Sequence, residues 1–103
     1  MATGFPLQSL SDAEITVSTA GTAEQVNSGT SLLCFHCIIT ADGGNSGNMF
    51  VGSSSVASTH YAKKLAADES ITLGFWSPIP QFDLSSIWLD TSSSGDGVHI
   101  LYM

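Results

Sequence analysis

Three histidines and many serines are the residues of this chain that could form a hydrolytic site. His36, His60 and His99 are well separated along the chain, so chance Ser-His-Asp combinations are easy to find. Nucleophilic catalysis needs a nucleophile, a base and a group that orients the base. The chain has no Gly-x-Ser-x-Gly turn to expose a serine. The serine run at residues 53–55 is therefore interpreted as a loop connection.

Carboxylates are the second group that could do chemistry. Asp68 and Glu69 are adjacent, and Asp83 precedes Asp90 by seven positions. A glycosidase needs two carboxylates that face each other across a cleft, which adjacent carboxylates on a turn do not provide. The loop at residues 42–47, DGGNSG, has no lysine for a phosphate and lacks the ligand spacing and final glutamate of a calcium loop. We expect no catalytic site, no cofactor and no metal, and hence a protein that is not an enzyme.

Cys34 and Cys37 are the only cysteines. Residues three apart on one strand point to opposite faces, so the spacing predicts neither a disulfide nor a shared metal ion. Structural zinc needs four ligands, and His36 would add only a third. We expect two buried thiols that behave as small apolar side chains, which suits a protein assembled in a reducing cytoplasm.

The chain of 103 residues carries a net charge of −7, and its only cations are Lys63 and Lys64. Binding to nucleic acid or to an anionic membrane surface depends on lysine and arginine, so neither partner is expected. No apolar run approaches the ~20 residues of a membrane span, and residues 1–10 lack the features of a signal peptide. Charged residues make up only 11% of the chain, and its hydroxyl-rich surface favours contact with proteins or neutral glycans.

Alternating apolar and polar residues predict about seven short strands, separated by glycine- and serine-rich turns. The expected strands are residues 13–19, 23–27, 31–41, 48–53, 70–76, 83–90 and 98–102. Together they indicate an all-β fold, an antiparallel β-sandwich of jelly-roll-like form.

Two local features are part of this prediction. Residues 31–41 are expected to form a central strand covered on both faces, joined to residues 48–53 in a β-hairpin through the loop at 42–46. Residues 56–65 show no clean period and are expected to form a loop or a single helical turn.

The expected organisation is an N-terminal arm, residues 1–12, followed by one β-sandwich domain, residues 13–103. The arm is either a frayed terminus or a segment that docks on a neighbouring subunit. Pro78 and Pro80 prevent regular strand pairing around them, and the connection is either an exposed apolar surface or a loop folded over the end of the sandwich. Six apolar residues on these two segments are the candidate partner-binding residues: Phe5, Leu7, Leu10, Trp76, Ile79 and Phe82.

Five stretches occur in an order that resembles a known series. They are ITVSTAGTA at residues 15–23, GNMFVG at 47–52, LAADESITL at 65–73, DLSSIWLD at 83–90 and GDGVHILY at 95–102. Small structural virion proteins of tailed bacteriophages carry the similar series vtTaGTA, GNiyVG, LaPGEs, dLskIyvDa and GdGVsvlY. The chain departs from it in having Ala67-Asp68 in place of Pro-Gly, in the prolines after Trp76, and in the segment that carries Cys34 and Cys37.

The resemblance implies a non-enzymatic virion protein that acts as a capsid cement or decoration protein. Such a protein is a homo-oligomer, a dimer or trimer, that binds the major capsid protein. It is placed on the capsid surface of the virion and assembled in the host cytoplasm. A neck, tail or baseplate component is the alternative, and a carbohydrate-binding module that stacks sugars on Trp76 and Trp88 is a further one.

Overall fold

Ten strands and one short 3-10 helix make up the regular structure of the described residues. The structure, a computed structural model, describes residues 10–28, 31–74 and 82–103. All strand pairs within these ranges are antiparallel, so the predicted all-β class is confirmed. The strands are β1 (Ser11–Thr16), β2 (Glu24–Gln25), β3 (Leu33–Cys34), β4 (His36–Ala41), β5 (Met49–Gly52), β6 (Lys63–Leu65), β7 (Ser70–Gly74), β8 (Phe82–Asp83), β9 (Trp88–Thr91) and β10 (Gly97–Tyr102), and the 3-10 helix is Leu84–Ser86.

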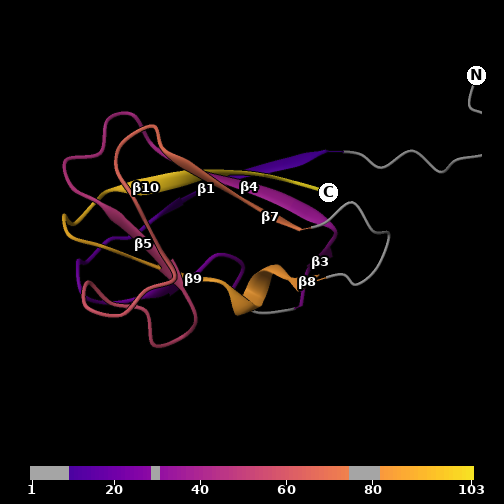
Figure 1. Ribbon diagram of the computed structural model, residues 1–103, viewed down its shortest axis with the longest axis horizontal. Helices are drawn as coiled ribbons and strands as arrows, with labels where there is room; N and C mark the ends of the chain where they lie inside the picture. The colour runs from indigo at the N-terminus through magenta and orange to yellow at the C-terminus, as the bar shows by residue number, and fades with distance from the viewer. Residues whose placement is uncertain (1–9, 29–30, 75–81) are drawn as a thin grey trace, which may run out of the picture.

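The strand pairs are nested. β1 pairs with β10, β2 with β9, β3 with β8, β4 with β7 and β5 with β6. The chain therefore runs out to the β5–β6 connection and returns alongside itself. Two further pairings, β10 with β4 and β9 with β5, join the pairs into four-stranded sheets of order β1-β10-β4-β7 and β2-β9-β5-β6. Figure 1 shows β1, β10, β4 and β7 as one layer above β5 and β9.

The core lies between these two sheets. Alternation along β10 buries Val98 and Ile100 and exposes His99 and Leu101, as the period of two along a strand requires. The most deeply buried side chains come from both sheets and their connections: Val17, Ile39, Met49, Leu65, Leu84, Leu89, Val98 and Ile100.

The predicted hairpin between residues 31–41 and 48–53 is wrong. β4 lies in one sheet and β5 in the other, so the glycine-rich loop between them crosses from layer to layer. Gly43 and Gly44 correctly predict that the chain changes direction at this loop. They do not reveal the hydrogen bonds that hold this loop to the β9–β10 loop on the far side of the sequence.

The predicted single strand at residues 31–41 is broken at Phe35 into β3 and β4. At the break, the Phe35 N–H donates to the Met103 carbonyl at 2.8 Å. Gly74 has φ +109°, and a Cβ at this position would clash with the Phe35 carbonyl. Because the chain turns here, Cys34 and Cys37 both lie in the same hydrophobic core and not on opposite faces of one strand.

Two further predictions are corrected. Residues 83–90 do not form one strand, because the Asp83 carboxylate accepts hydrogen bonds from the Ser85 N–H at 2.9 Å and from its hydroxyl at 2.7 Å, which caps the 3-10 helix. Residues 56–65 contain β6 and no helical turn.

β1 begins at Ser11, so the last two residues of the expected arm belong to a sheet. Ser11 lies opposite Tyr102, and Asp12 lies opposite Leu101. Within the described ranges, no helix is long and apolar enough to cross a membrane.

Candidate functional site

The outer face of the β1-β10-β4-β7 sheet carries the most distinctive surface of the described chain. Ile38 on β4 lies directly opposite Leu101 on β10, and their exposed fractions are 38% and 41%. Directly opposed strand residues on one face are in side-chain contact range. Two large apolar side chains therefore lie together on the solvent side of a sheet whose other side faces the core.

A shallow hollow of about 500 Å³ surrounds this apolar pair. Register explains its lining, because Asp12 lies opposite Leu101 and Glu14 lies opposite His99. The side chains of the outer face that line the hollow are Asp12, Glu14, Ile38, Thr40, His99 and Leu101. We name this surface, with Ile38 and Leu101 at its centre, the outer face. It combines an apolar centre with acidic groups contributed by the edge strand β1.

His99 and Asp42 form an ion pair at one end of the outer face. The His99 Nε2 donates to the Asp42 Oδ1 at 2.6 Å, and the Gly44 N–H donates to the Asp42 Oδ2 at 2.9 Å. The hydrogen bond from His99 and that from Gly44 hold the pKa of Asp42 below its ordinary value of 3.8. The bond to Asp42, with a smaller effect from the charge of Glu14, raises the pKa of His99 above 6.5. Both side chains favour their charged forms.

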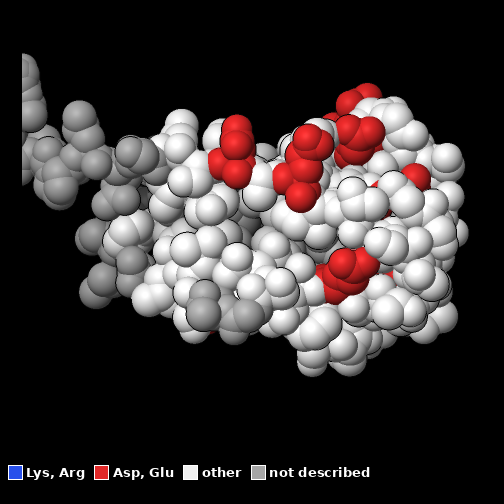
Figure 2. Space-filling view, turned by 180° about the vertical axis from the view of Figure 1, so that it is seen from behind, with Lys and Arg blue, Asp and Glu red and all other residues white. Residues whose placement is uncertain are grey.

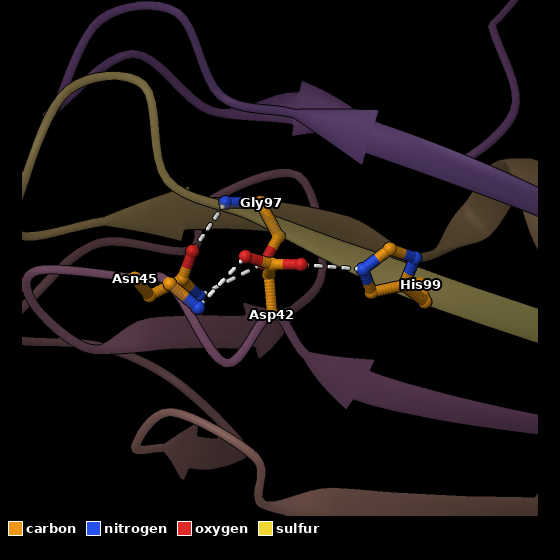
Figure 3. A network of polar contacts seen from close by, with 5 residues as sticks. Asp42, Asn45, Gly97 and His99 are labelled. Atoms are coloured by element: carbon orange, nitrogen blue, oxygen red, sulfur yellow. Dashed lines mark hydrogen bonds and ion pairs between the residues drawn. The ribbon is translucent and has the colours of Figure 1, made fainter.

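Asn45 fixes the loop that carries Asp42. Its side-chain Nδ2 donates to the Gly97 carbonyl at 2.9 Å, and its Oδ1 accepts from the Gly97 N–H at 2.9 Å. The side-chain amide of Asn45 thus pairs with both backbone groups of Gly97. Figure 3 shows Asn45 and His99 on either side of Asp42, with Gly97 above. The result is a fixed position for Asp42 beside β10.

Asp96 ties the same loop down from the β9–β10 connection. Its two carboxylate oxygens accept from the Ser46 N–H at 3.0 Å and from the Gly47 N–H at 2.7 Å. Asp96 is almost fully buried, and a carboxylate is the side chain that can accept two backbone donors in this way. Hydrogen bonds to Asp96 and Gly97 therefore hold this loop in place beside the Asp42–His99 pair.

The Asp42–His99 pair supplies two of the three groups that a hydrolytic triad uses. Such a mechanism also needs a nucleophile hydrogen-bonded to the second ring nitrogen. Within the described residues, the His99 ring has a hydrogen bond only to Asp42. In the same part of the chain, no group of three His, Cys, Asp or Glu side chains could hold a metal ion. The described geometry shows an ion pair beside an apolar pair on one side of a sheet.

A second hollow, of about 420 Å³, opens between the edges of the two sheets. Tyr61 lines it and stacks on Phe50, with 5.2 Å between ring centroids. Ile71, Leu73 and Ile87 contribute its apolar lining. Because Phe50 is buried beneath Tyr61, the loop that carries Tyr61 covers the outer side of β5.

The candidate partner-binding residues fall into two groups. Phe5, Leu7, Trp76 and Ile79 lie outside the described residues. Leu10 is 61% exposed, directly before β1. Phe82 on β8 is half-buried and packs against the core, so less of it is available to a partner.

Sequence reasoning missed the outer face itself. Ile38 lies in the most apolar run of the chain, between Cys37 and Ile39, where every residue looks like core. The signal that could have revealed it is the strict period of two along β4: Cys37 and Ile39 are buried, and Ile38 between them must point to the other side.

Comparisons with protein-family models, with curated proteins and with solved structures each found no match.

Proposed function

We propose that this chain is a non-enzymatic virion protein, a capsid cement or decoration protein that binds and stabilises the lattice of the major capsid protein. It acts on the capsid surface as a homo-oligomer, a dimer or trimer, after assembly in the host cytoplasm. The observation that carries the proposal is the opposed, exposed pair Ile38 and Leu101 on an ordered sheet. Apolar groups gathered on a surface are typical of a protein contact.

We further propose that the fold is a jelly-roll-like β-sandwich. The nested strand pairs support this, since a jelly roll is a long antiparallel hairpin rolled into two sheets. With β3 and β8 set aside, the remaining strands form the sheet orders β1-β10-β4-β7 and β2-β9-β5-β6. The first and last strands then lie side by side in one sheet, and the second and second-last in the other.

The composition suits such a role. Only 11% of the residues are charged, so much of the surface can be covered without removing ions from water, and desolvation of ions is the main cost of burying a polar surface. One outer face is small, and its contact alone is weak. In an oligomer that engages several capsid subunits at once, avidity raises the affinity by about 10²–10⁴.

The test uses expanded capsids of the source phage assembled without this chain. Purified protein is mixed with them and sedimented, and its oligomeric state is measured separately by light scattering. We expect a stable dimer or trimer that co-sediments with a copy number comparable to that of the capsid subunits. A strictly monomeric protein that stays in the supernatant would contradict the proposal, and a copy number of a few per particle would assign the chain to the neck or tail.

A further inference from the structure

We propose that the outer face is the docking surface of this chain, and that its occupant is a partner segment carrying an apolar side chain flanked by lysine or arginine. The inference rests on the proposed function in one respect: it takes the capsid lattice as the structure that carries this partner segment. Its chemistry is argued from the outer face alone.

The apolar centre calls for an apolar group on the partner. Ile38 and Leu101 are opposed on neighbouring strands β4 and β10, in the interior of the sheet rather than at its edges. Their backbones are hydrogen-bonded on both sides, so the two side chains sit on a rigid support. Rigid, pre-ordered anchors lose little conformational entropy when a partner binds.

The surrounding groups set the charge of that partner. Asp12 flanks Leu101, Glu14 flanks His99, and Asp42 lies beyond His99. Among the described residues, the Asp12 side chain has no hydrogen-bond or ion-pair partner, so its carboxylate is available. Figure 2, seen from behind, shows acidic side chains along the upper rim, where β1 lies, and no lysine on that face of the molecule.

The positive charges of this chain are remote from the outer face. Lys63 and Lys64 are both on β6, an edge strand of the other sheet. His99 is the basic side chain among those that line the hollow, and its charge is paired with Asp42 at 2.6 Å. The acidic groups around the apolar centre are thus complementary to lysine or arginine supplied from outside.

The same charges disfavour a second copy as the occupant. Two outer faces packed against each other bring the Asp12, Glu14 and Asp42 carboxylates of both copies into one interface, and each copy carries a net charge of −7. Like charges brought together in an interface weaken binding and suppress that pairing. A basic partner has the opposite effect, since it gains from each carboxylate on the rim.

The test compares two double variants with two matched controls. I38T/L101T removes the apolar centre while keeping residues of high strand propensity, and L33T is its control, since Leu33 is 57% exposed on β3 outside this sheet. D12N/E14Q removes two charges from the rim. E24Q/E69Q removes two charges elsewhere and keeps the acceptors for the Ser18 and Ala66 N–H groups. Circular dichroism and melting curves establish that each variant is folded.

Binding is measured with two probes. The first is the expanded capsid, at 50 and at 300 mM salt. The second is a pair of synthetic peptides, Lys-Leu-Ile-Leu-Lys and its glutamate-flanked counterpart, titrated into isotope-labelled protein and followed by NMR. We expect I38T/L101T to bind capsids at least about tenfold more weakly, and D12N/E14Q to lose most of the salt dependence of binding. The lysine peptide should shift the signals of β10 and β4, and the glutamate peptide should not.

The outcomes separate this inference from the proposed function. If the wild-type protein and all variants bind capsids equally, the function stands and the outer face is not the docking surface. If no protein binds capsids, the function fails, and the peptide shifts alone decide the inference: shifts outside β10 and β4, or none, overturn it. If I38T/L101T instead abolishes self-association, the occupant is a second copy and the proposal is overturned.

Discussion

At the scale of single residues, Asp42 and His99 stabilise each other's charged forms although both side chains are about half exposed. His99 has a pKa raised above 6.5, so its contribution to stability is complete below that pH and is lost as the pH rises through the raised pKa. Asp42 has a pKa below 3.8, so its contribution is present above that pH and is lost in more acidic solution. The pair therefore contributes most between about pH 4 and 6.5.

We predict that Asp42→Asn lowers the pKa of His99 toward its ordinary value, because the carboxylate is the main cause of the raised value. Glu14, across the strand pair, should keep a small part of the shift. The measurement is an NMR titration of the His99 ring signals in both proteins. A His99 titration that is unchanged in Asp42→Asn would show that the ion pair does not form in solution.

Asp96 is the second residue for which the structure makes a sharp prediction. Asparagine has one carbonyl oxygen, so Asp96→Asn directs an amide N–H₂ at one of the two backbone donors of Ser46 and Gly47. A buried donor without an acceptor costs about 1–3 kcal/mol. Urea unfolding should show this loss. The control is Asp12→Asn, an exposed site where the change should stay within about 0.5 kcal/mol, and equal effects in both variants would contradict the assigned role of Asp96.

Cys34 and Cys37 were predicted to be buried thiols, and they are. Burial raises the pKa of Cys34 to about 11, with the charge of Asp83 adding to it, and raises that of Cys37 to about 12. Their burial as neutral thiols stabilises the fold fully below about pH 9, and this contribution is lost as the pH rises through those values.

We predict that Cys37→Ser destabilises the protein more than Cys37→Ala does. Cys37 is fully buried, and a hydroxyl without a partner in its place costs about 1–3 kcal/mol, whereas alanine loses only part of the packing. Chemical denaturation of the two variants checks the order. Rapid alkylation of both thiols in the folded wild-type protein at pH 7 would contradict their burial.

At the scale of elements, β10 is the strand on which the first sheet depends most. It pairs with β1 on one side and β4 on the other, Ile100 lies in the core, and the Met103 N–H donates to the His36 carbonyl at 3.1 Å. The alternation of residues 98–102 predicted this strand and its inward face. It could not predict the two neighbours, which come from distant parts of the chain.

We predict that deleting Ile100–Met103 abolishes cooperative folding. The deletion exposes part of the core and removes half of the partners of β1. As a milder test, Ile100→Ala should cost about 2–5 kcal/mol. Thermal melts followed by circular dichroism give both results. A truncated protein with the wild-type melting curve would contradict the central position of β10.

The elements also show where local sequence stops being informative. The strands at β5, β7 and β10 follow from alternation, and the turn before β7 follows from its small and acidic residues. The break at Phe35 and the crossing after β4 depend on contacts with Met103 and with the β9–β10 loop. A pattern read along one segment does not contain these partners.

At the scale of the whole molecule, every pairing between the described strands joins one of β1–β5 to one of β6–β10. This is why the sequence gives the all-β class but not the strand order, and why it could not place Ile38 next to Leu101. We predict slow refolding, in milliseconds to seconds, because distant pairings must form before they are stabilised. Stopped-flow fluorescence measures the rate, and microsecond refolding would contradict the nested pairing.

The pairing of β1 with β10 also has a consequence during protein synthesis. β1 leaves the ribosome early, but neither it nor β4 gains the strand between them until residues 97–102 have emerged. The sheet is completed only after residues 97–102 have been translated, so a nascent chain stalled before that point exposes the apolar side of β4. Ribosome stalling or premature termination in this region should therefore yield a chaperone-bound or degraded product rather than a partly active protein.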